Sequence, residues 1–191
     1  MEIVYKSFSA GEEIPVNNFL KNRKLKKYFN RETAASIVAV GALTKGEIFD
    51  ENTPFYFSYG EIEYNIVDRA NDSLDENGQF QNDLFVNKSY NNVSPLTQLK
   101  YLQNMPMSFV SIEFGLRGDN AVVYNSSDSL IQCVELSPYE GRILIGACKQ
   151  YFDGTVEVGF ALGLRSELIN IKYSPSVTAI EMFKAAAGIN E

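Results

Sequence analysis

The stretch 125–129, which reads Asn-Ser-Ser-Asp-Ser, holds the residues of this chain that could do chemistry. It follows an apolar run at 121–124 and opens a segment of helical character. A helix N-terminus offers unpaired backbone N–H groups and the positive end of the helix dipole, which can stabilise an oxyanion or activate a nucleophile. Ser127 lies where such a nucleophile would lie. Four residues are candidates for its general base, although none has a spacing that favours it: Asp128, Lys149, Glu135 and Glu113.

The same serines are typical of a helix cap. Ser129 and Gln132 form the Ser-x-x-Gln pattern of a capping box. Ser126 or Ser127 could cap the helix equally well, and such a cap contributes about 1 kcal/mol. A serine hydroxyl is a poor nucleophile without a base. The local pattern therefore favours a cap and leaves a catalytic serine open as the alternative.

The chain contains no histidine. Histidine is the commonest general base at neutral pH and the commonest metal ligand. Its absence excludes Ser-His-Asp and Cys-His activation within these residues. The two cysteines, Cys133 and Cys148, fit neither a disulfide framework nor the spacing of metal ligands. We therefore expect no metal site and no cofactor.

The bulk composition predicts one globular domain, residues 1–191, because 45% of the residues are hydrophobic and 21% are charged. A net charge of −7 argues against a nucleic-acid surface, which needs a basic patch. One basic cluster, KNRKLKK at 21–27, is either a solvated helix face or a docking surface for an acidic partner.

No apolar run approaches the roughly 20 residues that a membrane helix needs. The first residues also lack the charged lead and the apolar core of a signal peptide. We expect a cytoplasmic protein without a membrane span.

Hydrophobic patterning predicts strands alternating with helices, and hence an α/β fold with a mixed, mostly parallel sheet on which helices pack. The stretch 155–164 is expected to run antiparallel to the strand before it. The polar stretch 68–92 is expected to be a long surface loop or a mobile excursion. The expected strands are 1–8, 54–59, 121–124, 142–147 and 155–164. The expected helical segments are 15–29, 31–43, 95–109, 129–137 and a C-terminal helix capped by Ser174 with Pro175 at its first position.

Five stretches, taken in order along the chain, carry a resemblance to a known family: LKKYFNRETAASIVAVGAL (25–43), PFYFSYG (54–60), VSPLTQLKYLQNMPMSFVSIEFGLRGDN (93–120), YNSSDSL (124–130) and GRILIGACKQ (141–150). Together they resemble the N-terminal half of β-ketoacyl synthases, the condensing enzymes of fatty acid and polyketide synthesis, which have the thiolase fold. The resemblance implies a thiolase-like half as the fold.

The chain departs from this family at the residues that do the chemistry. Asp119 stands where the family usually has proline, and Ser127 stands where it has its nucleophilic cysteine. The family's two catalytic histidines lie in a C-terminal half that has no counterpart in these 191 residues. We therefore expect a stand-alone half without the catalytic cysteine and histidines, in which Cys133 is a small core residue rather than a displaced nucleophile. The vestigial site, or acyl-binding candidate, comprises Asn125, Ser126, Ser127, Asp128 and Ser129.

The resemblance also implies partners. In the family the two halves pack together and the subunits then dimerise, so a lone half exposes an apolar face, which is unfavourable by about 25 cal/mol per Å². We expect a homodimer, or a heterodimer with a ketoacyl synthase, and acyl carrier protein is a further candidate partner. The interface candidates, near which the family's subunits meet, are Ala121, Val122, Val123 and Tyr124.

Three functions follow from these expectations. The favoured one is a non-catalytic, chain-length-factor-like subunit in fatty acid, polyketide or aryl-polyene-type biosynthesis. The second is an acyltransferase or thioesterase-like enzyme that uses Ser127. The third is a module that binds an acyl chain or an acyl carrier protein without chemistry.

Overall fold

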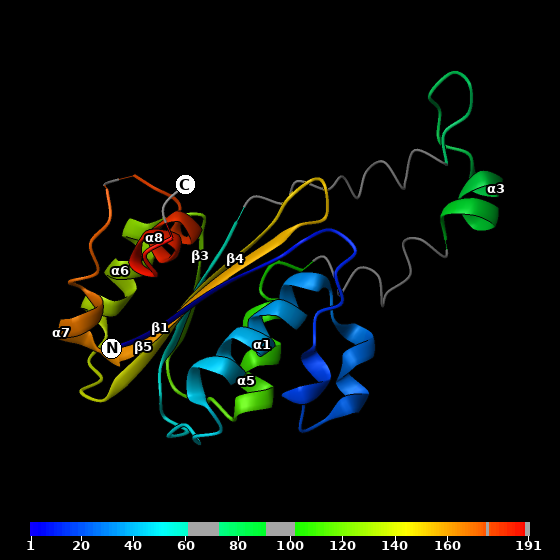
Figure 1. Ribbon diagram of the computed structural model, residues 1–191. Coiled ribbons are helices and arrows are strands. Elements are labelled where there is room, and N and C mark those ends of the chain that lie inside the picture. The colour runs from blue at the N-terminus through cyan, green and yellow to red at the C-terminus, as the bar shows by residue number, and fades with distance from the viewer. Residues whose placement is uncertain (61–72, 91–101, 175, 190–191) are drawn as a thin grey trace.

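A computed structural model of the chain (Figure 1) describes residues 1–60, 73–90, 102–174 and 176–189. Its centre is a five-stranded sheet in the order β1-β5-β4-β2-β3. The strands are β1 (Glu2–Phe8), β2 (Phe55–Tyr59), β3 (Asn120–Tyr124), β4 (Arg142–Gln150) and β5 (Val156–Leu164). The helices that flank it are α1 (Arg31–Thr44), α5 (Met105–Phe114), α6 (Ser127–Leu136), α7 (Arg165–Leu168) and α8 (Ala179–Ala186).

The pairing of the strands confirms a mixed sheet with helices packed on it. Strand β2 pairs parallel with both β3 and β4, whereas β5 pairs antiparallel with both β4 and β1. Half of the pairings are therefore antiparallel, and the expectation of a mostly parallel sheet does not describe them. The reason is local: Gly154 takes a left-handed φ of 89° in the tight turn after β4, and this turn returns the chain directly alongside β4 as β5.

Helices cover both faces of the sheet (Figure 1). On one face α1 and α5 pack over Phe57, Leu144 and Phe160. On the other face α6, α7 and α8 pack over Tyr56 and Ile145. Because β4 and β5 are buried on both faces, their sequences are nearly continuous apolar runs rather than alternating ones.

The helix predicted at 31–43 is α1, and it is almost wholly buried. Asn30 caps it, since the Asn30 side chain accepts a hydrogen bond from the backbone N–H of Thr33 at 2.8 Å. Its glycine is required for packing: a Cβ on Gly41 would lie 2.2 Å from the ring of Phe19. The segment predicted as helical at 15–29 forms two short 3-10 helices, η1 (Val16–Asn18) and η2 (Arg23–Tyr28).

Two helix starts differ from the sequence prediction. The helix expected at 95–109 begins only at Met105 among the described residues and continues to Phe114, where Gly115 ends it with a φ of 75°; residues 95–101 lie outside the described part. The C-terminal helix α8 is capped by Thr178, not by Ser174. Thr178 and Glu181 satisfy a capping box in both directions, which fixes the start four residues later; Pro175 lies outside the described residues.

Within the expected polar loop 68–92, residues 73–90 are described and the rest are not. They form a tight turn followed by α3 (Asn82–Leu84) and a π-helical turn, η3 (Phe85–Ser89). The expected long polar loop therefore contains short helical turns in this part.

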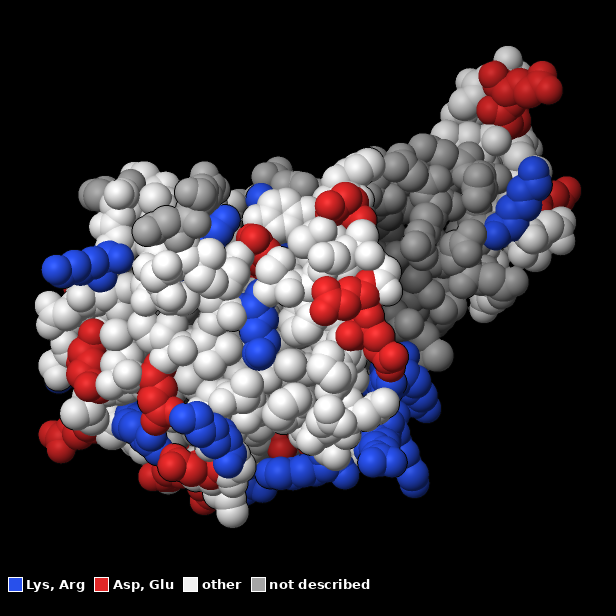
Figure 2. Space-filling model, viewed as in Figure 1, with Lys and Arg blue, Asp and Glu red and all other residues white. Residues whose placement is uncertain are grey.

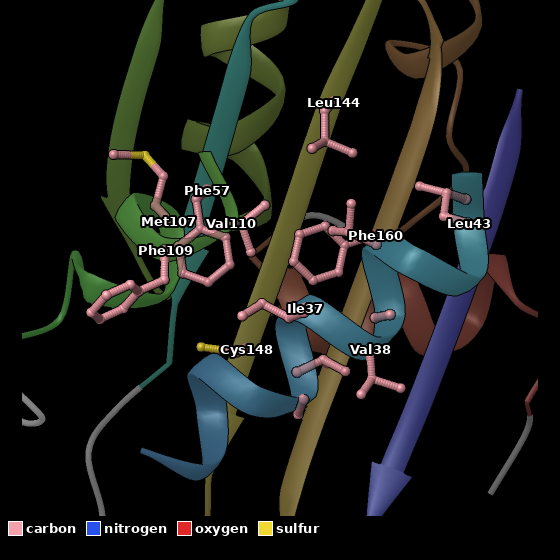
Figure 3. Packing of buried hydrophobic residues seen from close by; sticks show 14 of the residues in the cluster. Ile37, Val38, Leu43, Phe57, Met107, Phe109, Val110, Leu144, Cys148 and Phe160 are labelled. Atoms are coloured by element: carbon pink, nitrogen blue, oxygen red, sulfur yellow. The ribbon is translucent and has the colours of Figure 1, made fainter. Parts of the chain in front are cut away.

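The ring of Phe160 lies at the centre of the core (Figure 3). It is fully buried, and its centroid lies 6.1 Å from the centroids of both Phe55 and Phe57. Gly146 makes room for it, because a Cβ there would lie 2.2 Å from the Phe160 ring. The pair Gly146 and Phe160, opposite each other on β4 and β5, therefore sets how closely α1 can approach the sheet.

We expect Phe160→Ala to lower the free energy of unfolding by about 3–5 kcal/mol, because it removes a buried ring and leaves a cavity. Phe152→Ala, at a ring that is 77% exposed, is the matched control and should change it by less than about 0.5 kcal/mol. Urea denaturation followed by circular dichroism measures both. Equal effects of the two substitutions would contradict this description of the core.

Candidate functional site

The turn between β3 and α6 carries the predicted site. Asn125, directly after β3, has a left-handed φ of 43°, a conformation that asparagine tolerates better than most residues. Its backbone N–H donates to the carbonyl of Tyr59 at 2.8 Å, which ties the turn to the end of β2. The chain therefore reverses sharply at the edge of the sheet and enters the helix within two residues.

Ser126 is the N-cap of α6. It has extended backbone angles, and its hydroxyl accepts a hydrogen bond from the backbone N–H of Ser129 at 3.1 Å. Of the three serines that could cap the helix, the structure selects Ser126, and the Ser129 capping box does not form. Ser129 instead lies in the first turn of the helix, where its backbone N–H donates to the Ser126 hydroxyl.

Ser127 is the first residue of α6 and is completely buried. Its hydroxyl donates to the backbone carbonyl of Val177 at 2.8 Å, and its backbone N–H points to the same oxygen at 3.4 Å. The hydroxyl proton and one of the free N–H groups of the helix N-terminus are thus both directed at a carbonyl of the same chain. An incoming carbonyl carbon has no access to the Ser127 oxygen in this arrangement.

The chain that leads into α8 forms this cover. Tyr173 hydrogen-bonds to the Asp128 carboxylate, and burial together with that bond raises the pKa of the Tyr173 phenol. Ser176, next to Val177, has a left-handed φ of 65°, which is unusual for a residue other than glycine. Sequence reasoning missed this contact, because a backbone carbonyl 50 residues away leaves no signal in the residue types.

None of the four candidate bases serves Ser127. Asp128 is engaged by Tyr173, and Glu135 is exposed on the last turn of α6. Glu113 lies on α5, across the sheet, and accepts the backbone N–H of Lys21. Lys149 holds its ammonium 4.5 Å from the centre of the Tyr151 ring. The Ser127 hydroxyl therefore donates to the Val177 carbonyl and to none of the four predicted bases.

The two cysteines are not activated. Burial raises the pKa of both thiols, with the charge of Asp119 adding to the effect at Cys133 and that of Glu32 at Cys148. Cys133 packs at the margin of the core on the α6 face, in agreement with the expected core role. Neither thiol has the lowered pKa of a nucleophilic cysteine.

A buried pair that the sequence did not reveal joins α1 to β4. The thiol of Cys148 donates to the Glu32 carboxyl at 3.6 Å, and Glu32 is only 6% exposed. Burial raises the pKa of Glu32 and outweighs the hydrogen bonds from Cys148 and Asn30, which favour the carboxylate. Because this pair lies on the α1 face and Ser127 on the α6 face, it does not belong to the same site.

The interface candidates 121–124 form β3, which is an edge strand of the described sheet and pairs only with β2. Ala121, Val122 and Val123 are half-buried, and Tyr124 is 54% exposed. The Tyr124 ring lies 5.3 Å from that of Tyr59 on the neighbouring strand. The outer backbone groups of β3 have no partner strand within the described chain.

Within the described residues, no group of three or more metal-ligating side chains could hold a metal ion. None of the described helices has both the length and the apolar character to cross a membrane. Shallow clefts open on the surface of the described residues. One of ≈ 410 Å³ lies beside α8 and is lined by Tyr173, Val177 and Glu181, and one of ≈ 390 Å³ lies beside the start of α1.

No protein-family model and no curated protein matches this chain. Among solved structures, the chain is similar to one described as "The ishigamide ketosynthase/chain length factor", at 15% sequence identity and a TM-score of 0.48. The match covers 76% of this chain and 47% of that one, so the chain spans less than half of the length of that protein.

The roles of the three serines can be separated by stability. We expect Ser126→Ala and Ser127→Ala each to lower the free energy of unfolding by about 1 kcal/mol, the first by loss of the cap and the second by loss of a buried hydrogen bond. Ser129→Ala, in the same helical turn, is the matched control and should stay within about 0.5 kcal/mol of the unchanged protein. A larger loss for Ser129→Ala than for Ser126→Ala would contradict the assigned cap.

Proposed function

We propose that this chain is a non-catalytic, ketoacyl-synthase-like subunit that pairs with itself or with an active synthase. Its role would resemble that of a chain-length factor in fatty acid, polyketide or aryl-polyene-type biosynthesis. The observation that carries the proposal is the state of Ser127: the residue at the family's nucleophile position is buried, and its hydroxyl is bonded to the Val177 carbonyl. In this proposal Ser127, which the resemblance places at the nucleophile position, contributes to packing and not to chemistry.

Chemical requirements support the non-catalytic role. A serine nucleophile needs a base within hydrogen-bond reach and an open approach for its substrate. The whole chain lacks histidine, and the hydroxyl of Ser127 donates to an acceptor that cannot take up its proton. The acyltransferase or thioesterase alternative therefore has no observation in its favour.

The fold supports the family resemblance in general terms. A five-stranded mixed sheet with helices on both faces is compatible with a thiolase-like half. The strand-turn-helix unit around Asn125 falls where the resemblance puts the nucleophile turn. A subunit of this kind would act through its partner, by shaping the partner's acyl tunnel, as the resemblance implies for a chain-length factor.

The edge strand β3 supports the pairing. An unpaired edge presents a row of backbone donors and acceptors that a second chain can continue. The side chains on β3 are small and apolar in the middle, at Ala121, Val122 and Val123, so no charge opposes a neighbouring strand there. We infer that β3 is where this subunit meets its partner.

The absence of chemistry at Ser127 can be measured by intact mass. After incubation with acyl-CoA, and separately with acyl carrier protein loaded with an acyl group, we expect no covalent adduct on this chain. An active condensing enzyme in the same mixture is the positive control. An acyl adduct that disappears in Ser127→Ala would overturn the proposal and favour the enzyme.

Charged substitutions on β3 test whether this strand pairs with a second chain. A twofold antiparallel pairing centred on Val122 would place Asn120 of one chain opposite Tyr124 of the other, so Asn120→Lys with Tyr124→Lys sets like charges against each other. We expect sedimentation velocity to show that these charges weaken dimer association, with the Kd raised by about tenfold or more. Ser7→Lys on β1, the opposite edge of the sheet, is the control and should leave association unchanged. A chain that stays monomeric alone and with an active ketoacyl synthase would contradict the pairing.

A further inference from the structure

Residues 73–90, here called the 73–90 segment, form a locally ordered unit that stands apart from the sheet in Figure 1. Asp75 organises its first half: one carboxylate oxygen accepts the backbone N–H groups of Asn77 and Gln79 at 2.9 Å each, and the other accepts the Gln81 amide at 2.8 Å. Gly78 supplies the left-handed residue of the turn, with a φ of 73°. The turn is therefore fixed by its own polar contacts.

An aromatic row runs along this segment. The ring of Phe85 lies 5.6 Å from that of Phe80 and 6.3 Å from that of Tyr90. The π-helical turn η3 produces the spacing, because the backbone N–H of Tyr90 bonds to the carbonyl of Phe85 at 2.7 Å. The rings are thus held in place before any partner arrives, which lowers the entropy lost on binding.

The row is not covered by the chain that carries it. Phe80 is 57% exposed, Val86 is 62% exposed and Tyr90 is 55% exposed. Exposed aromatic side chains that are already ordered are typical of the centre of a protein interface. Two acidic residues without an ion pair in the described chain, Glu76 and Asp83, lie beside them.

The opposite chemistry is present on another part of the same chain. The η2 surface, defined by Lys21, Arg23, Lys24, Lys26 and Lys27 with the ring of Tyr28, carries five exposed cations. Figure 2 shows Lys and Arg atoms gathered over this region and Asp and Glu atoms at the tip of the 73–90 segment. Within the described residues none of these five cations forms an ion pair, and Lys27 only stacks over Tyr28 at 4.8 Å.

We propose that the 73–90 segment of one copy docks on the η2 surface of a second copy, an inference that rests on the proposed self-pairing. The row of Phe80, Phe85 and Tyr90 meets the cations of η2 by cation–π contact, and Glu76 and Asp83 pair with its lysines. Within one described chain, the 73–90 segment and the η2 surface do not contact each other. In a twofold dimer the segment of each copy can dock on the η2 surface of the other, so the same contact forms twice.

The charges decide between a second copy and an acidic carrier protein as the occupant of the segment. An acidic carrier would be repelled by Glu76 and Asp83, which flank the aromatic row. The acidic residues and the aromatic row of the segment favour a basic surface, and the five exposed cations of η2 provide one. The η2 surface lies on the face of the sheet covered by α1 and α5, whereas Ser127 lies on the other face. Docking on η2 would therefore contribute to assembly and would not involve Ser127.

Site-specific photocrosslinking in a mixture of unlabelled and ¹⁵N-labelled protein tests the contact between copies. A photoreactive benzoylphenylalanine replaces Phe80 in unlabelled protein, which is mixed with ¹⁵N-labelled unchanged protein and irradiated. We expect crosslinked peptides that join an unlabelled Phe80 peptide to a labelled peptide from 21–28. The same group at Phe152 is the control and should give no such product. Crosslinks confined to one isotope, crosslinks elsewhere, or none would overturn the proposal.

Charge reversal gives a second, independent readout. Glu76→Lys with Asp83→Lys, and separately Lys24→Glu with Lys27→Glu, should each weaken self-association by about threefold or more, because each opposes like charges across the contact. All four changes in one chain should restore the Kd to within about twofold of the unchanged protein. Failure of this rescue overturns the contact.

The outcomes also separate this inference from the proposed function. If the β3 substitutions break the dimer but no crosslink reaches 21–28, the docking of the segment fails and the proposed subunit role stands. If the crosslink forms but the β3 substitutions have no effect, the segment docks and the edge pairing fails.

Discussion

The whole fold depends on covering β4 and β5 on both faces. Strands whose sequences are nearly continuous apolar runs cannot face water on either side, so α1 and α5 must pack on one face and α6 and α8 on the other. Phe160 opposite Gly146 fixes the separation of α1 from the sheet, and Gly159, where a Cβ would lie 2.2 Å from Phe183, does the same for α8. The edges of the sheet receive less cover, which is why β3 is only half-buried. Its capacity to pair with another chain is thus a consequence of where the two helical layers end.

The position of Ser127 follows from the same demand. Helix α6 must return from the edge strand across its own face of the sheet, and the left-handed Asn125 and the cap at Ser126 make that return short. α8 packs on the same face, and the chain before it therefore crosses the N-terminus of α6, where the Val177 carbonyl accepts a hydrogen bond from the Ser127 hydroxyl. A serine is suited to this place because its hydroxyl is small and supplies a donor to a carbonyl that would otherwise lose its contact with water. The packing accounts for the residue without any chemistry.

The sequence predicts what local residue patterns encode. The alanine-rich stretch of α1 and the apolar runs of β4 and β5 were predictable, because composition and length distinguish them. The antiparallel return at Gly154 was also predictable, because a short turn sequence that ends in glycine separates the two apolar runs. The start of α8 was not, because Ser174-Pro175 and Thr178-x-x-Glu181 both resemble helix starts and only the packing of α8 selects Thr178. The Ser127 contact with Val177 and the Cys148 contact with Glu32 were hidden, since each joins residues 50 or more positions apart.

The turn at Ser127 and the 73–90 segment differ in how far the chain itself covers them. Chemistry would require Ser127 to be accessible and its helix N-terminus to be free, yet both are engaged by the chain itself. Assembly requires the reverse on the outside of the molecule: ordered apolar groups such as Phe80 that the chain leaves uncovered, and an edge strand without a charge in its centre. A chain arranged in this way would act by what it binds, which is the basis of the proposed function. The proposed subunit role depends in the same way on surface shape and charge, and it needs no reacting atom at Ser127.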